Sequence, residues 1–308
     1  MQIIIHAKNS GRRLDKYLFS FLNNAPHSFV YKMLRKKRIK LNSKRALGSE
    51  IISEGDVLSF YIAEETLDSL RKDIFVPVAK PTPDIIFEDE NFVFVNKPAG
   101  LASQGGMEGK NDHLLAHLLY YLQSKGDYPP GADFTPALIN RLDINTSGLV
   151  LCGKNLKSLQ TFGAMLKEQK IKKEYLAVVE GYVKVIEKKV LKNYYSKDKK
   201  NRTAKIVENG STQEIITKYT ALASNKTHSL LLVEPITGRF HQIRAHLAYA
   251  GHPIAGDKKY GGKPTKYAKH QLLHSYSFTI PGFDKTWLAP PPGYFMKCVK
   301  DLFMWEEF

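Results

Sequence analysis

Cysteine is scarce in this chain, which argues against a fold held together by disulfides or by a structural zinc ion. Only Cys152 and Cys298 occur, far apart in sequence, and no paired metal-ligand spacing surrounds either of them. Neither a disulfide framework nor a zinc site is indicated, so we expect both cysteines to be small buried hydrophobic residues. His241 and His246 are five residues apart, whereas two ligands on one helical face need an i, i+4 spacing. We expect no metal.

Long apolar segments, internal repeats and low-complexity stretches are also missing from the sequence. The N-terminal residues 1–6 lack the layout of a signal peptide, and no lipidation motif is present. We therefore expect no membrane partner and a cytoplasmic location. The 308 residues, 43% of them hydrophobic and 25% charged, are typical of a globular protein with room for two domains.

Acidic residues are too few to balance the basic ones. Thirty Asp and Glu stand against forty-six Lys and Arg, which gives a formal net charge of +16. An excess of this size favours a polyanionic partner, because basic side chains attract phosphates and release their counterions. Nucleic acid is the first candidate.

The first sixty residues predict a small domain of helices and strands. Apolar residues between positions 14 and 22 follow the i, i+3, i+4, i+7 spacing of an amphipathic helix, and a second helix is predicted through residues 29–34. Apolar residues that alternate with polar ones then predict half-buried strands near residues 39–41 and 58–62.

This small domain carries a basic surface. Eight Lys and Arg occur between residues 32 and 45 with no acid among them, and they fall at the end of a helix and across the next strand. We therefore expect Lys36, Lys37 and Arg38 to contribute to RNA binding. The segment is similar to the RNA-binding module of a small-subunit ribosomal protein (S-four-like), on three short motifs at residues 12–18, 37–42 and 55–58.

The remaining chain divides into a linker and a second domain. Residues 63–83 turn acidic and then gather three prolines, which suits a linker between an N-terminal domain of residues 1–62 and a second domain of residues 84–308. The second domain opens with two apolar strands around an acidic turn. Residues 183–206 carry nine bases against two acids, which predicts a protruding basic loop or hairpin.

Asp143 is the first candidate catalytic residue. It lies in the stretch 141–149, Arg-Leu-Asp-Ile-Asn-Thr-Ser-Gly-Leu, whose polar residues favour a loop, and residues 149–152 predict a buried strand directly after it. Enzymes often place reactive groups on a loop beside a rigid element. The alternative is an ordinary Asx turn before a strand.

Three later segments contain possible partners of Asp143. Tyr175 stands at the start of an apolar strand, residues 172–181, where a half-buried strand aromatic is the alternative. A helix is predicted from Thr237-Gly238 with Phe240 on its apolar face and Arg244 near the edge of the core, where a carboxylate such as Asp143 would pair with it. The tight glycine-bounded loop at residues 253–262 is expected to be structural.

Several of these motifs, in this order, strongly resemble the RluA-type pseudouridine synthases. The resemblance rests on residues 140–149, 173–175, 237–247 and 256–257, together with 96–100. It covers essentially the whole chain, because a basic N-terminal module ahead of the catalytic domain is the layout of the family's large-subunit ribosomal RNA branch (RluC/RluD-like). Asn140 and Phe240 depart from the family, where His and Thr are usual.

The resemblance implies a cofactor-free isomerisation of uridine to pseudouridine in RNA, with the target base flipped into a pocket. It implies that Asp143 is the nucleophile and that Arg141 fills the space left in the base stack. Tyr175 would stack on the uracil and assist proton transfer, and Arg244 would orient Asp143. Arg239 and His241 would contact the RNA, since they belong to the matching motif.

The expected protein is therefore an α+β enzyme. The resemblance implies a catalytic domain with a mixed, mainly antiparallel sheet, preceded by the small α/β module, and we expect a monomer whose partner is large-subunit ribosomal RNA. Two alternatives stay open. One is a non-catalytic RNA-binding or ribosome-assembly protein, and the other is a pseudouridine synthase that acts on transfer RNA.

Overall fold

The computed structural model of the chain describes residues 1–6, 9–70, 81–105, 112–128, 134–186, 188–198, 203–207 and 213–306. Its contacts divide the chain into two compact units. One contains Met1–Thr82 with Ala116–Ala137 and Gly153–Gln160, and the other contains Pro83–Leu115, Leu138–Cys152 and Thr161–Phe308.

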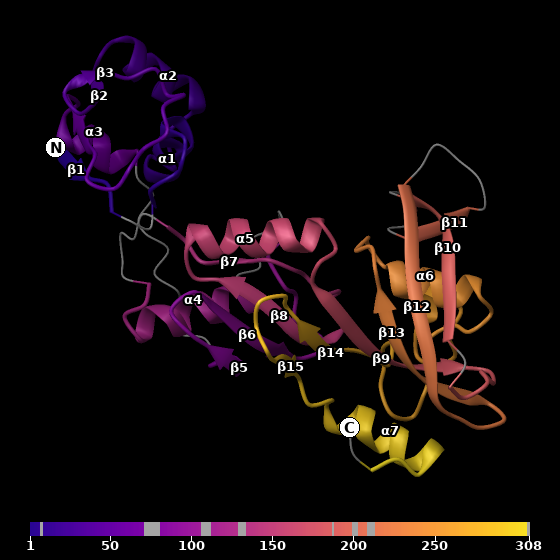
Figure 1. The fold of residues 1–308 in the computed structure, drawn as a ribbon. Coiled ribbons are helices and arrows are strands. Elements are labelled where there is room, and N and C mark those ends of the chain that lie inside the picture. The colour runs from indigo at the N-terminus through magenta and orange to yellow at the C-terminus, as the bar shows by residue number, and fades with distance from the viewer. Residues whose placement is uncertain are drawn as a thin grey trace. The chain divides into compact units, whose positions relative to one another are not determined.

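The N-terminal part of the first unit is a four-stranded sheet with three helices (Figure 1). The strand order is β1-β4-β2-β3, and all three pairings are antiparallel. The elements are β1 (Gln2–Ile4), α1 (Leu14–Phe21), α2 (His27–Arg35), β2 (Ile39–Leu41), β3 (Lys44–Arg45), β4 (Val57–Phe60) and α3 (Glu64–Ser69). Both predicted helices and the predicted strand at 39–41 are confirmed, and the strand predicted near 58–62 is present as β4, which ends at Phe60.

The helices of this part bury the apolar positions that their spacing predicts. Leu14, Tyr17 and Leu18 of α1 are fully buried and join one core with residues of α2 and the sheet. Helix α3 adds Leu67 to the same core, so the segment expected as a linker, 63–83, begins with a helix. Residues 71–80 of that segment lie outside the described residues.

The second unit is built on an eleven-stranded sheet. The strand order is β11-β10-β12-β13-β9-β14-β8-β6-β5, with β15 beside β14 and β7 beside β8. Of the strand pairs whose direction is determined, only β14 with β8 is parallel, so the predicted mixed, mainly antiparallel sheet and the α+β class are confirmed. The strands are β5 (Asp84–Glu88), β6 (Phe92–Lys97), β7 (Ala137–Leu138), β8 (Ser147–Gly153), β9 (Lys172–Glu180), β10 (Lys188–Asp198), β11 (Thr203–Val207), β12 (Gln213–Ser224), β13 (His228–Pro235), β14 (Leu273–Thr279) and β15 (Thr286–Leu288).

Helices cover this sheet on both faces. Successive side chains of a strand point to opposite faces, and β9 follows that rule. Tyr175, Ala177 and Val179 join the apolar cluster that includes α6, whereas Leu176 and Val178 join the cluster that includes α7. The helices of the remaining chain are α4 (Leu114–Ser124), α5 (Leu156–Lys167), α6 (Gln242–Tyr249), the 3-10 helix η2 (Lys258–Tyr260) and α7 (Gly293–Phe303).

The basic segment at 183–206 contains the expected hairpin. Strand β10 pairs antiparallel with β11, and the pairing brings Asp198 opposite Thr203. Helix α6 contacts β11 and β12, and Figure 1 shows these elements in the same part of the unit. Among the bases of this segment, Lys199, Lys200 and Arg202 lie outside the described residues.

The predicted start of the helix after residue 236 is wrong. Helix α6 begins at Gln242 instead of Thr237, because His241 adopts a left-handed conformation (φ 55°) and the Gln242 side chain bonds back to the preceding loop. Phe240 therefore lies before the helix and is 38% exposed, away from the predicted apolar face. At the other end, Gly251 follows the helix with φ 83°, a conformation that suits glycine at a helix C-terminus.

Cys152 and Cys298 are both buried and neither forms a disulfide, which confirms that they act as small hydrophobic residues. No helix in the described part of the chain is long and apolar enough to cross a membrane.

Two histidines of the second unit are fully buried. His246 Nδ1 lies 2.8 Å from Thr217 Oγ1, and His274 bonds Ser147 Oγ through Nδ1 and the Ala289 carbonyl through Nε2. Burial lowers the pKa of both imidazoles to about 4. Both rings are therefore neutral in the folded protein above that pH.

This burial predicts acid sensitivity between pH 6.5 and pH 4. In that window the unfolded chain binds protons that the folded protein does not, so the free energy of unfolding falls as the pH falls. Each histidine contributes at most about 1.4 kcal/mol per pH unit. Urea unfolding at pH 6.5, 5.5 and 4.5 should show a shallower decline in His246→Asn than in the wild type. Equal declines would mean that His246 does not contribute.

Candidate active site

Asp143 lies on the loop that leads into the buried strand β8. The Thr146 N–H donates to the Asp143 carbonyl over 3.0 Å, which closes a turn around the residue. Gly148 lets β8 approach β14: a Cβ atom there would lie 2.1 Å from the Ser275 carbonyl oxygen, and its φ is 110°. The predicted loop and the predicted strand are therefore both present. Position 148, at the start of the strand, requires glycine, because a side chain there would clash with Ser275.

Two buried side chains, Lys97 and Ser103, hold the backbone of the Asp143 loop through hydrogen bonds. Lys97 is fully buried, and its Nζ donates to the carbonyls of Pro98, Leu101 and Ile144 at 2.8, 2.8 and 3.0 Å. Burial lowers the pKa of Lys97 to about 7, and the charge of Asp143 opposes that shift. Ser103 Oγ exchanges hydrogen bonds with both the N–H and the carbonyl of Leu142. Both neighbours of Asp143 are thus anchored.

Arg244 of α6 joins two carboxylates. Its Nη1 lies 2.8 Å from Asp143 Oδ2, while Nε and Nη2 donate to the two oxygens of Asp257 at 2.7 and 2.8 Å. The Asp257 side chain is 1% exposed and that of Asp143 is 26% exposed. Burial opposes the charge of Arg244, but the bonds to Asp257 and the charges of both acids raise its pKa overall. Arg244 is therefore a fixed cation that points one N–H at Asp143.

His241 approaches the same oxygen of Asp143. Its Nε2 lies 3.5 Å from Asp143 Oδ2, and its Nδ1 lies 2.9 Å from Tyr260 Oη. Burial lowers the pKa of His241 to about 4, so the ring is neutral at pH 7. Among the residues that the structure describes, none bonds to Oδ1 of Asp143. One carboxylate oxygen is therefore held while the other is available for reaction.

Tyr175 enters the site from β9. It shares an apolar cluster with Ile243 and Leu142, which are the neighbours in sequence of Arg244 and Asp143. Burial raises the pKa of the Tyr175 phenol to about 12, the hydrogen bond with Ser275 opposes that shift, and the charge of Asp143 adds to it. The phenol therefore keeps its proton at pH 7 beside the Asp143 carboxylate.

The structure brings four of the predicted site residues together and leaves the others on the surface. Asp143, Tyr175, His241 and Arg244 form one group. Arg141 is exposed on the same loop, and Arg239 is exposed just before α6. Lys36, Lys37 and Arg38 are exposed on the turn between α2 and β2 of the N-terminal part.

Three further residues were not predicted as part of the site. Asp257 and Tyr260 lie in the loop that was expected to be structural, and Lys97 lies in residues 96–100. Lys97 and Asp257 fall within motifs of the family resemblance, but neither was given a role in the site. Besides the family resemblance of residues 256–257, the sequence carries one local signal for Asp257, which is an acid between glycines in a loop that follows a core-edge arginine. The burial that makes Asp257 a partner of Arg244 is a property of the fold.

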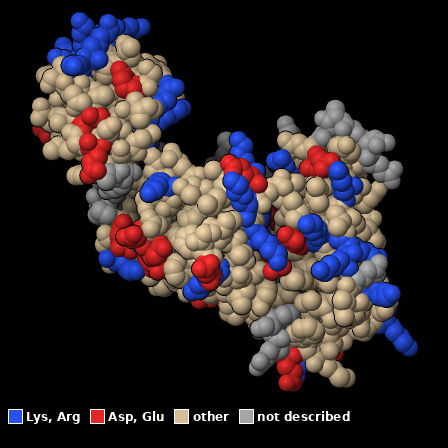
Figure 2. Space-filling model, in the orientation of Figure 1, with Lys and Arg blue, Asp and Glu red and all other residues tan. Residues whose placement is uncertain are grey.

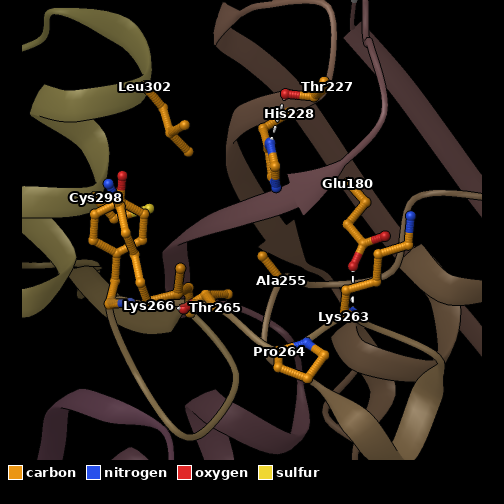
Figure 3. A pocket seen from close by; sticks show the side chains of 12 residues that line it. Glu180, Thr227, His228, Ala255, Lys263, Pro264, Thr265, Lys266, Cys298 and Leu302 are labelled. Carbon is orange, nitrogen blue, oxygen red and sulfur yellow. Dashed lines mark hydrogen bonds between the residues drawn. The ribbon is translucent and has the colours of Figure 1, made fainter.

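A separate cavity of about 370 Å³ lies beside α7 (Figure 3). Glu180, His228, Lys263 and Cys298 are among its lining residues, and the Lys263 N–H donates to Glu180. Burial raises the pKa of the Cys298 thiol to about 12, so this sulfur is not a reactive thiolate. None of the predicted site residues lines this cavity.

Similarity to known proteins identifies the family of this site. Residues 91–249, which contain Asp143, Tyr175 and Arg244, match the family described as RNA pseudouridylate synthase. The chain belongs to that family. It is therefore an RNA pseudouridine synthase, an isomerase, and the resemblance noted in the sequence is confirmed.

Curated members of the family match over most of the chain. The ribosomal large subunit pseudouridine synthase C of Haemophilus influenzae is 33% identical over 288 residues, covering 89% of this chain and 85% of that protein. The protein of the same name in Rickettsia bellii is 36% identical over 299 residues, covering 92% and 95%. Human RNA pseudouridylate synthase domain containing 4 shares the fold, with a TM-score of 0.57, 21% identity, and coverage of 70% of this chain and 91% of that one.

Proposed function

We propose that this pseudouridine synthase isomerises specific uridines in large-subunit ribosomal RNA, with Asp143 as the nucleophile. The observation that supports the nucleophile is the partly exposed Asp143 carboxylate, which Arg244 holds through Oδ2 so that Oδ1 can react. The substrate is supported by the names of the relatives from Haemophilus influenzae and Rickettsia bellii, which are large-subunit enzymes.

The isomerisation requires no net change in atoms. In the proposed reaction, Asp143 Oδ1 forms a bond to C1′ of the ribose as the C1′–N1 bond breaks, and the uracil keeps the electron pair on N1. The uracil then turns, its C5 attacks C1′, and the carboxylate leaves. Loss of the proton on C5 and protonation of N1 complete the product. The fixed guanidinium of Arg244 aims the carboxylate for both displacements.

The uridine must leave the base stack before Asp143 can reach it, at a cost of a few kcal/mol. We propose that the exposed side chain of Arg141, two residues before the nucleophile, fills the space that the base leaves. Tyr175 presents its ring beside Asp143 and stacks on the flipped uracil. Arg239 and His241 contact the substrate from the start of α6.

Residues 1–62 are proposed as an S-four-like RNA-binding module, residues 63–83 as a linker, and residues 84–308 as the catalytic domain. Figure 2 shows Lys and Arg gathered on the end of the module where β3 and α2 are labelled in Figure 1. Lys36, Lys37 and Arg38 are exposed in that part of the chain. These bases supply positive potential for the RNA backbone.

Neutralising Lys36, Lys37 and Arg38 together, each to Gln, should weaken RNA binding and flatten its salt dependence. Each lost phosphate contact lowers the slope of log Kd against log salt by about 0.7 to 0.9, so a reduction of roughly 2 is expected. Filter binding across a salt series measures it. The matched control neutralises Lys285, Lys297 and Lys300, which are exposed on the second unit. An unchanged slope in the first variant would reject this face as the binding surface.

We also propose that the enzyme acts as a monomer in the cytoplasm. All the groups that hold Asp143 come from one chain, so a second copy is not needed to complete the site.

The substrate proposal is tested with three RNA transcripts that carry tritium at C5 of uridine: large-subunit ribosomal, small-subunit ribosomal and transfer RNA. The purified protein should release tritium from the large-subunit RNA alone. Release from transfer RNA alone would overturn the substrate and favour the transfer RNA enzyme. Binding without release from any RNA would favour a non-catalytic assembly protein.

A further inference from the structure

The nucleophile is connected through His241 to a tyrosine outside the group predicted from the sequence. Tyr260 Oη accepts a hydrogen bond of 2.7 Å from the N–H of Ala204, and it lies 2.9 Å from His241 Nδ1. His241 Nε2 in turn faces Asp143 Oδ2. We propose that Tyr260 is a positioning residue, which holds His241 in the tautomer whose Nε2 hydrogen points at Asp143. The inference rests on the proposed role of Asp143.

In the proposed arrangement, the Tyr260 hydroxyl donates to His241 Nδ1. A phenol has one hydrogen, and burial raises the pKa of Tyr260 to about 12, so that hydrogen is present at pH 7. Because the Ala204 N–H already donates to Oη, the phenol's own hydrogen is free to go to His241 Nδ1. Nδ1 is then the acceptor of a neutral ring, and the ring proton lies on Nε2.

This tautomer gives Asp143 a second donor without adding a charge. Arg244 already donates to Oδ2 over 2.8 Å, while the His241 contact to the same oxygen is 3.5 Å and too long for a regular hydrogen bond. Catalytic hydrogen bonds often tighten only when substrate is bound. Two donors on Oδ2 would leave Oδ1 as the oxygen that attacks. The opposite tautomer would turn a lone pair of Nε2 toward the carboxylate and repel it.

Tyr260 contacts Arg244 through its ring and His241 through its hydroxyl, and a substitution can remove the second contact while keeping the first. The Arg244 guanidinium carbon lies 5.0 Å from the centre of the Tyr260 ring, a cation–π distance. Tyr260→Phe keeps that ring and removes only the hydroxyl. The series of contacts from Ala204 through Tyr260 and His241 to Asp143 begins on β11, which is part of the basic hairpin.

The first test measures the tautomer and requires no activity. Nitrogen-15 NMR of the full protein with labelled histidine, assigned by the signal lost in His241→Gln, should show an unprotonated Nδ1 and a protonated Nε2 at His241. In Tyr260→Phe, the two ring forms should become mixed. A protonated Nδ1 in the wild type, or an unchanged pattern in the variant, would overturn the inference whether or not the proposed substrate is correct.

The second test measures coupling between the two residues. Tyr260→Phe should lower the single-turnover rate on saturating large-subunit RNA by roughly tenfold, the effect of one good hydrogen bond, while the Kd for RNA changes less than about twofold. His241→Gln keeps an N–H that can reach Oδ2 without help from Tyr260. In that background, Tyr260→Phe should lower the rate by less than about twofold.

Exposed Tyr182 provides the control, since Tyr182→Phe should leave the rate and the melting temperature unchanged. Equal losses from Tyr260→Phe in both backgrounds would show that Tyr260 does not act through His241. A wild-type protein without activity on any of the three RNAs would overturn the proposed function, and the NMR result would still decide the tautomer.

Discussion

Asp143→Asn is expected to lower pseudouridine formation by at least about 10⁴-fold, the scale of loss seen when an enzyme loses its covalent nucleophile. An amide cannot form the bond to C1′ that the carboxylate forms. The amide oxygen can still accept the N–H of Arg244 that now bonds Oδ2, so the folded protein should lose little stability. Tritium release from C5-labelled RNA measures the rate.

Binding and folding are the controls for this variant. The Kd for RNA should stay close to that of the wild type, because the basic surfaces are unchanged. Asp284→Asn, which removes an exposed carboxylate, should keep full activity. An active Asp143→Asn protein would show that Asp143 is not the nucleophile, although the protein would still belong to the family.

Arg244→Ala is expected to damage both folding and activity. It would leave the carboxylate of Asp257, whose side chain is 1% exposed, without its bidentate partner. Breaking a buried ion pair on one side costs about 3–5 kcal/mol of unfolding free energy, and urea titration at pH 7 measures it. Activity should fall by at least about 10²-fold, because Asp143 loses the group that aims it.

The double variant tests whether Arg244 and Asp257 act as a pair. Removal of both side chains leaves no unpaired buried charge, so Arg244→Ala with Asp257→Ala should be less destabilised than the sum of the single variants by about 1 kcal/mol or more. Arg244→Lys should rescue little, because an ammonium cannot bond Asp257 through two parallel N–H groups and reach Asp143 at once. Additive losses would show that the two residues are not coupled.

The order of polar and apolar residues predicts a helix or strand of this fold well where a single periodicity is clear. The buried strand after Asp143 and the loop before it follow from the switch between polar and apolar residues at 147–152. The amphipathic helix α1 follows from its spacing. The helix near Arg244 was predicted five residues too early, because a left-handed His241 and a glutamine that bonds backwards leave no periodic signal.

The site was less predictable than the elements, because its contacts join distant segments. Arg244 and Asp143 are 101 residues apart, and the core-edge position of Arg244 predicts a carboxylate partner without a geometry for the pair. Asp257 lies in a glycine-bounded loop, and it is its burial against Arg244 that makes it part of the site. Lys97 belongs to the site because its Nζ donates to the carbonyl of Ile144, and this long-range contact cannot be predicted from local sequence.

Pseudouridine mapping of ribosomal RNA from cells that lack this gene tests whether Asp143 of this enzyme forms pseudouridines in large-subunit RNA. The cells are complemented with the wild-type gene, with the Asp143→Asn variant or with an empty vector. We expect defined pseudouridines of the large-subunit RNA to disappear in the deletion, to return with the wild type, and to stay absent with Asp143→Asn. An unchanged large-subunit map in the deletion, or restoration by the variant, would contradict the account.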